Sequence, residues 1–133
     1  MLRWIQRFEN LEKAVQNLCD TKKCIESEGI NKIYTMALIQ AFEIVFELSW
    51  KTLKDYLEFN GILTDTPRET IKQAFAKNII KDGQTWIEMM EARNKTSHTY
   101  QEEFAKELCD DILNKYSTQI NSLIEFLKGK VND

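Results

Sequence analysis

One proline and four glycines are the only residues of their kind in this 133-residue chain, and they fall where helices should begin or end. The segment Thr66-Pro67-Arg68-Glu69 has the pattern of a helix start with a capping box. Gly29, Gly61, Gly83 and Gly129 follow apolar-periodic stretches, where glycine commonly ends a helix. No stretch alternates with period two between turn residues. The sequence therefore predicts an all-α fold.

Apolar residues at three- and four-residue steps predict four long helices and one short helix. The long helices are expected over residues 2–26, 31–60 and 100–128 and from about residue 84 through Arg93, and the short one over 67–78. Thr99 is expected to cap the last helix, Gly129 to end it, and Phe75 to pack in the core. Because the connections are short, these elements predict a single domain (residues 1–133), an up-and-down four-helix bundle with one additional short helix.

The second helix carries two apolar stripes, where a helix that buries one face needs only one. One stripe is Leu38, Ala41, Val45 and Leu48; the other is Phe42, Phe46, Ser49, Leu53 and Leu57. Either the helix is central in the bundle or its second stripe forms a homodimer interface, and both explanations stay open. Its remaining face is expected to be solvated, with Lys51 paired to Glu47 and to Asp55.

Composition narrows the class of protein. Apolar residues make up 43% and charged residues 29%, as in soluble globular domains. No apolar run approaches the roughly 20 residues needed to span a bilayer, and no signal peptide opens the chain. We therefore expect a cytoplasmic protein with no membrane association.

Charge and cysteine content bear on partners and metals. The net charge of −3 argues against coating nucleic acid by bulk attraction, although residues 67–99 carry six cations and four anions. Cys19, Cys24, Cys109 and the single histidine lack the spacing of a zinc site. No metal and no cofactor are expected.

A polar segment, Arg93-Asn94-Lys95-Thr96-Ser97-His98-Thr99-Tyr100, joins the last two helices and holds the only histidine. Arg93 and His98 are five residues apart, so on an unbroken helix they would point about 140° from each other. They could converge if the helix breaks within residues 96–99, a run of poor helix formers. They could also converge if a two-fold axis brings the Arg93 of one subunit beside the His98 of another.

The residue types in this segment suit metal-independent RNA cleavage. Histidine can accept and return a proton near neutral pH, and arginine binds phosphate through two hydrogen bonds. His98 would deprotonate a 2′-hydroxyl that attacks the adjacent phosphate, Arg93 would offset the developing charge, and Asn94 could orient the imidazole. The alternative is that these polar side chains only satisfy carbonyls and solvent at a helix junction.

The segment from Arg93 to Tyr100 matches the Arg-x4-His-x-Tyr motif of HEPN domains (higher eukaryote and prokaryote nucleotide-binding). Most of the chain resembles one subgroup, the nucleotidyltransferase substrate-binding proteins. The matching segments are Ala41-Phe42-Glu43, residues 47–56, Gly61, Pro67-Arg68-Glu69, residues 71–75, Asp82-Gly83, Trp86 and Met89.

This resemblance implies a helical bundle that forms a homodimer with two motifs facing one cleft. It implies a separately encoded minimal nucleotidyltransferase as antitoxin partner, in a toxin–antitoxin-like module. The HEPN subunit would be a metal-independent ribonuclease with Arg93, Asn94 and His98 in its active site. Tyr100 would be modified with AMP to silence it, because a bulky anionic group there would occupy the phosphate site. Alternatively, Tyr100 packs on Trp86 or another neighbour as an ordinary helix-start aromatic.

Two other functions remain open from the sequence. The chain could be a non-catalytic subunit that presents a nucleotide or other substrate to a nucleotidyltransferase. Its ligand cleft would then be lined by Glu43, Glu47, Trp50, Lys51 and Asp55, with the polar segment binding a nucleotide phosphate. A purely structural dimerisation module is the third possibility.

Overall fold

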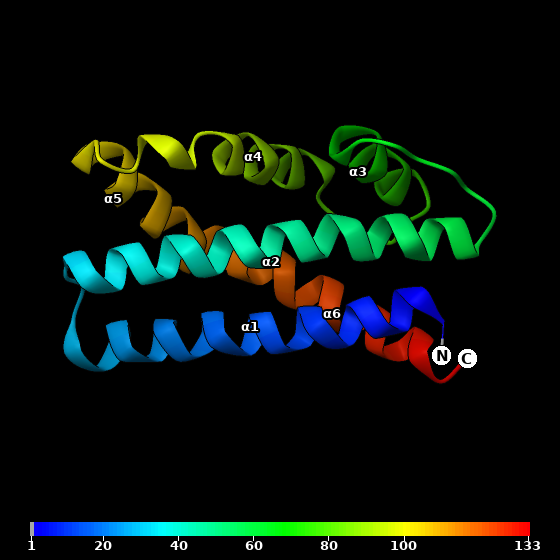
Figure 1. Cartoon of the computed structure of the whole chain (residues 1–133), viewed down its shortest axis with the longest axis horizontal. Coiled ribbons are helices and arrows are strands. Elements are labelled where there is room, and N and C mark those ends of the chain that lie inside the picture. The colour runs from blue at the N-terminus through cyan, green and yellow to red at the C-terminus, as the bar shows by residue number, and fades with distance from the viewer. Residues whose placement is uncertain (1) are drawn as a thin grey trace.

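The computed structural model describes residues 2–133, and every regular element among them is a helix (Figure 1). The all-α bundle is therefore confirmed; Met1, the first residue of the expected domain, lies outside the described residues. The elements are α1 Arg3–Glu28, α2 Lys32–Phe59, α3 Pro67–Ala76, α4 Gly83–Asn94, η1 Thr96–His98, α5 Glu102–Asp111, η2 Ile112–Tyr116 and α6 Ser117–Val131.

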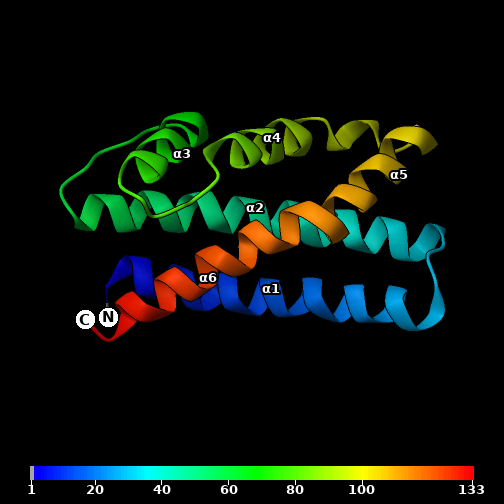
Figure 2. The same ribbon diagram turned by 180° about the vertical axis from the view of Figure 1, so that it is seen from behind.

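The helices form a layered bundle around α2. Helices α1 and α2 run antiparallel side by side, and α3 and α4 lie along the opposite side of α2 (Figures 1 and 2). The last helix, built from α5, η2 and α6, crosses α1 and α2 at an angle, and the C-terminus lies beside the N-terminus. The polar segment 93–100 connects α4 to α5 and lies at the end of the bundle where α2 begins.

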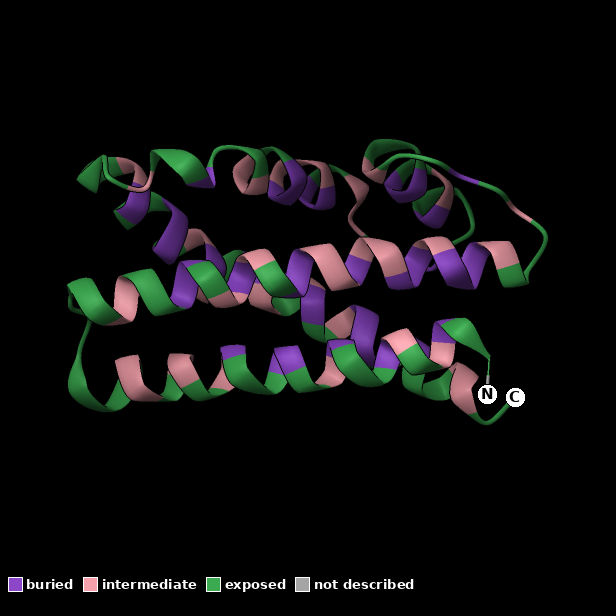
Figure 3. Cartoon of the chain, in the orientation of Figure 1, coloured by how far each residue is buried: buried purple, intermediate pink, exposed green. Residues whose placement is uncertain are grey.

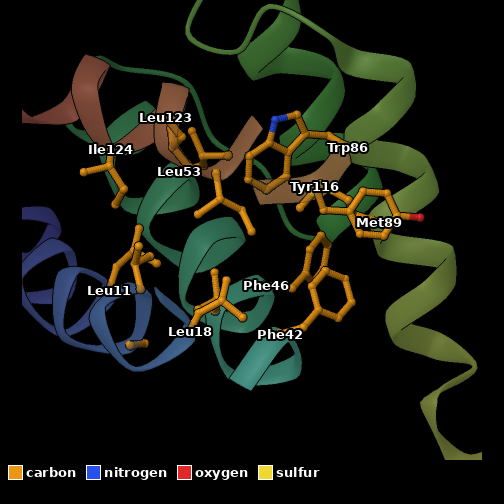
Figure 4. Close-up of a cluster of buried hydrophobic side chains, with 14 of the residues drawn as sticks. Leu11, Leu18, Phe42, Phe46, Leu53, Trp86, Met89, Tyr116, Leu123 and Ile124 are labelled. Atoms are coloured by element: carbon orange, nitrogen blue, oxygen red, sulfur yellow. The ribbon is translucent and has the colours of Figure 1, made fainter. Parts of the chain in front are cut away.

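Both apolar stripes of α2 contribute to one core, as the alternating buried positions show (Figure 3). On one side Phe42 stacks on Tyr116 with ring centroids 5.5 Å apart, and Phe46 lies 6.3 Å from Trp86 (Figure 4). Leu53 is fully buried in the same cluster. The two stripes are thus explained by the central position of α2, and only Ala41 and Leu48 remain half-buried.

By length and composition alone, α2 could cross a membrane, since its most apolar window has a mean hydropathy of 1.2. The expectation from sequence rested on continuous apolar runs alone and did not anticipate this. One such helix is weak evidence for a membrane span, because core helices pass the same test. Helix α2 contacts α1, α3, α4 and α5.

Asp55 departs from the expected solvated face of α2. Its carboxylate is buried and lies 2.7 Å from Nε of Arg7 and 3.8 Å from Nε of Arg3, both on α1. The predicted Lys51–Asp55 pair is wrong, whereas Lys51 Nζ does lie 3.8 Å from Glu47. Asp55 therefore ties α2 to α1.

Two glycines do not end helices as predicted. Gly83 begins α4 after Asp82, whose carboxylate accepts the backbone N–H of Thr85 at 3.0 Å. A Cβ at Gly83 would lie 2.9 Å from the ring of Phe75, which rests there 52% exposed instead of entering the core. Gly129 lies inside α6, which continues to Val131. Helix α3 ends before Asn78, which adopts a positive φ of 61°.

The last helix starts later than predicted and contains a π-helical turn. It begins at Glu102 after Gln101, so Thr99 is not its cap. The hydroxyl of Ser117 donates to the carbonyl of Ile112 at 2.6 Å, within the wide turn. The hydroxyl of Tyr116 donates to Glu88 on α4 at 2.9 Å, which fastens this turn to α4. Ile112 and Tyr116, the two ends of η2, are both buried in the core.

Candidate functional site at the end of the bundle

The polar segment turns sharply because α4 stops after Asn94. Thr96 is buried at the start of the 3-10 turn, and its hydroxyl lies 2.9 Å from the carbonyl oxygen of Arg93 and 3.0 Å from Oε2 of Glu43. The hydroxyl has one hydrogen to donate, and its two acceptors hold it where the end of α4 meets α2. The helix break expected between Arg93 and His98 is therefore present.

The guanidinium of Arg93 lies against α2 between two carboxylates. Its Nη1 is 3.8 Å from Glu43 and its Nε is 3.7 Å from Glu47. Both distances exceed hydrogen-bonding range, and the buried Nε has no hydrogen-bond partner among the described residues. The guanidinium is thus held by charge while its Nε–H remains unused.

Arg93 borders a groove of about 790 Å³ along the first half of α2, which we call the α2 groove. Its lining is Met36, Ala37, Ile39, Gln40, Glu43, Ile44, Glu47, Leu48, Arg93 and Thr99. Most of the lining residues are apolar, and the charged ones are Glu43, Glu47 and Arg93. This arrangement could receive a partly apolar ligand or a protein surface that also carries an anion or a hydrogen-bond acceptor.

The other residues of the motif point to solvent. Asn94 and His98 are exposed, and Tyr100 is 75% exposed with its ring centroid 6.2 Å from that of His98. In the described part of the chain no hydrogen bond or ion pair joins the side chains of Arg93, Asn94 and His98. At this exposure Tyr100 does not pack on the fully buried Trp86. Within one chain, therefore, the side chains of the motif are accessible but those of Arg93, Asn94 and His98 are not joined to one another.

The five residues expected to line a ligand cleft do not lie together. Glu43 and Glu47 line the α2 groove, and Trp50 contacts its edge only through a 3.3 Å hydrogen bond from Nε1 to Glu47. Lys51 follows one turn further along, and Asp55 faces α1. Among residues 2–133 no three His, Cys, Asp or Glu side chains are placed to hold a metal ion.

Thr96 is the residue of the site that sequence reasoning missed. It stood only within a run of poor helix formers, and its partner Glu43 is 53 residues earlier in the chain. The exposed apolar residues of the groove, Met36 and Ile44, were missed as well. A stripe of Ile33, Met36, Gln40, Ile44 and Glu47 at three- and four-residue steps was the signal that could have revealed them.

Comparison with known proteins bears on the same segment. The sequence matches the family described as nucleotidyltransferase substrate binding protein like over residues 6–129. It is 31% identical over 104 residues to a protein of Haemophilus influenzae named probable ribonuclease HepT, a match that covers 74% of this chain and 71% of the relative.

Solved structures agree with this assignment. A crystal structure from Thermus thermophilus has a TM-score of 0.78 at 28% identity, covering 86% of this chain and 96% of that one. HI0074 from Haemophilus influenzae, described as revealing the fold of a substrate binding domain of a nucleotidyltransferase, has a TM-score of 0.78 at 26% identity, with 91% and 98% covered. The chain belongs to the nucleotidyltransferase substrate binding protein-like family, whose members are HEPN-like helical bundles.

Proposed function

We propose that this chain is a metal-independent ribonuclease that works as a homodimer and is paired with a separately encoded minimal nucleotidyltransferase. The observation that carries the proposal is the position of Arg93, whose guanidinium borders the α2 groove and makes no hydrogen bond to Glu43 or Glu47. A guanidinium in this position can bind the phosphate of a ligand through two hydrogen bonds. The similarity to a probable ribonuclease supports RNA as that ligand.

Two features of the surface support the proposed dimer. Ile33, Met36 and Ile44 on the first half of α2 are 75%, 62% and 48% exposed, and the last two line the α2 groove with Arg93. Exposed apolar stripes of this kind mark protein interfaces. Since Arg93 and His98 do not meet within one chain, a second copy seated on this stripe would bring two motifs to one cleft.

The reaction uses one histidine from each subunit. The imidazole of one His98 accepts the proton of the 2′-hydroxyl, and the resulting oxygen attacks the neighbouring phosphorus. The protonated imidazole of the other His98 donates its proton to the 5′-oxygen as the P–O bond breaks. The products are a 2′,3′-cyclic phosphate and a 5′-hydroxyl. Arg93 offsets the charge on the pentacoordinate phosphorus, and Asn94 orients the imidazole.

Tyr100 is proposed as the site at which the partner nucleotidyltransferase attaches AMP. Its exposure of 75% leaves the hydroxyl open to another protein. Its ring lies 6.2 Å from that of His98, so an added phosphate would compete with RNA phosphate for the same cations.

The second candidate is a non-catalytic subunit that presents substrate to the nucleotidyltransferase. The description of HI0074 as a substrate-binding domain favours it, together with the size of the α2 groove. In this case the α2 groove binds a nucleotide and no bond in RNA is broken.

Cleavage of RNA by the purified dimer separates the two functions. We expect EDTA-insensitive cleavage that yields cyclic phosphate ends and disappears in Arg93→Ala and His98→Ala, with the fold and the dimer retained. A substrate of the same sequence with 2′-deoxy sugars should remain intact, because it lacks the attacking hydroxyl. Intact RNA together with nucleotide binding in the α2 groove would support the second candidate instead.

A further inference from the structure

Two residues outside the Arg-x4-His-x-Tyr pattern link its halves to one another. Oε2 of Glu43 is the acceptor, at 3.0 Å, for the hydroxyl of Thr96 and also the atom 3.8 Å from Nη1 of Arg93. The same hydroxyl lies 2.9 Å from the carbonyl oxygen of Arg93. A single carboxylate oxygen on α2 therefore contacts both the end of α4 and the turn that follows it.

The turn that Thr96 anchors determines where His98 projects. Thr96 opens the 3-10 turn, and the backbone N–H of His98 donates to the carbonyl of Lys95 at 2.9 Å. Unlike Asn94, Lys95, Ser97 and His98, which are all exposed, Thr96 is 8% exposed. The 53-residue separation in sequence means that this anchor is tertiary and not part of the local helix end.

From this geometry we propose that Glu43 and Thr96 are positioning residues of the ribonuclease site, which hold Arg93 and His98 in a fixed relation across the helix break. This inference rests on the proposed function, and it names Glu43 and Thr96 as the residues that align Arg93 and His98. Glu43 has a second effect, because its negative charge stands beside the phosphate position. It aligns the guanidinium and at the same time weakens its attraction for RNA.

Matched substitutions of Thr96 separate the hydroxyl from the volume of the side chain. Thr96→Val keeps the shape and removes the donor, Thr96→Ser keeps the donor, and Thr118→Val at an exposed position of α6 is the control. We expect kcat for RNA cleavage to fall about 10-fold or more in Thr96→Val with KM changed less than about 3-fold, because misaligned proton transfer slows chemistry more than binding. Thr96→Ser and the control should stay within about 2-fold of the parent kcat.

Substitutions of Glu43 test the other partner. Glu43→Ala should lower kcat as Thr96→Val does, and the double variant should be less impaired than the sum of the two single effects predicts, because both changes remove the Thr96–Glu43 hydrogen bond. Glu43→Gln retains an oxygen that accepts from Thr96 and should lower KM by roughly 2- to 5-fold through the lost repulsion. This fall in KM is a change that a purely structural role would not produce.

The single histidine provides a readout that needs no activity. The imidazole NMR signals of His98 should shift or broaden in Thr96→Val and Glu43→Ala, and should match the parent in Thr96→Ser. If the parent cleaves no RNA, the proposed function fails, while these signals still decide whether Glu43 and Thr96 position His98. Unchanged signals in Thr96→Val, a normal kcat in that variant of an active parent, or an additive double variant would each overturn the proposal.

Discussion

Helix α2 makes one arginine–carboxylate contact near its C-terminal end and another near its middle, and the two contacts differ in kind. Near its C-terminal end, Asp55 is buried and accepts a 2.7 Å hydrogen bond from Arg7. Near the middle of α2, Arg93 lies 3.7 Å from Glu47 and 3.8 Å from Glu43 without a hydrogen bond to either. We call the hydrogen-bonded Arg7–Asp55 contact closed and the contact of Arg93 with Glu43 and Glu47, which has no hydrogen bond, open.

The difference shows which contact supports the fold and which is available to a ligand. The Arg7–Asp55 bond is short and charge-assisted, and it joins α1 to α2 in the interior. Arg93 makes no hydrogen bond to either of its neighbouring carboxylates and borders the α2 groove. We therefore expect substitutions at the first contact to change stability and those at the second to change function.

The largest expected effect is on function at the open contact. Arg93→Ala should reduce RNA cleavage by about 100-fold or more, as the loss of a charge-stabilising donor commonly does. Its free energy of unfolding should change by less than about 0.5 kcal/mol, because no hydrogen bond is lost. Initial cleavage rates and urea unfolding at one protein concentration measure both. A large loss of stability would mean that the open contact is structural after all.

The next effect is on stability at the closed contact. Asp55→Asn should lower the free energy of unfolding by about 1–3 kcal/mol, because Arg7 keeps its charge but loses its anion. RNA cleavage at a temperature where the variant is folded should equal that of the parent. Lys51→Gln, one turn away on the exposed side, is the matched control and should change stability little. Reduced cleavage in folded Asp55→Asn would contradict the division between the two contacts.

A smaller effect is expected from the second carboxylate of the open contact. Glu47→Gln removes a negative charge beside the phosphate position and should tighten binding of a short RNA by roughly 2- to 5-fold at low salt. The gain should shrink as salt is added. Fluorescence anisotropy of a labelled 2′-deoxy-substituted oligonucleotide measures binding without cleavage. Weaker binding in this variant would show that Glu47 supports Arg93 more than it opposes the anion.

The smallest effect concerns a third carboxylate, Glu88, which is closed like Asp55. A hydrogen bond from Lys115, with a further one from Tyr116, holds the pKa of Glu88 below its usual value. A depressed pKa contributes stability above the unfolded pKa, near 4.3, and this contribution is lost as pH falls through the folded pKa. Glu88→Gln should therefore lower the melting temperature by a few degrees at pH 7 and by much less near pH 3. A difference that does not depend on pH would show that the carboxylate charge is not involved.

Sequence periodicity predicted the helices well and their charged faces less well. Glu43, Glu47, Lys51 and Asp55 follow one another at four-residue steps and were assigned to one solvated face. Each such step overshoots a full turn by about 40°, so Asp55 lies about 120° around the helix from Glu43. This rotation carries it onto α1, where Arg7 is its partner. Helical geometry contained the warning, but the partner is 48 residues away in the chain.

The site was predicted only in part, because some of its contacts also involve partners that are distant in the sequence. The run Thr96-Ser97-His98-Thr99 indicated a helix break, and the break is present after Asn94. Local propensity could not show that Thr96 is buried against Glu43, nor that Arg93 lies between two carboxylates of α2. Nor could it show that α5 begins only at Glu102, after Tyr100 is left exposed on the turn.

The sequence by itself determined the helical fold, the start of α3 and the break that separates Arg93 from His98, because capping and periodicity act over a few residues. The tertiary structure alone decided which charges are satisfied and which are open, since each depends on a partner from a distant helix. Asp55 pairs with Arg7 of α1, whereas Arg93 lies at the edge of the α2 groove.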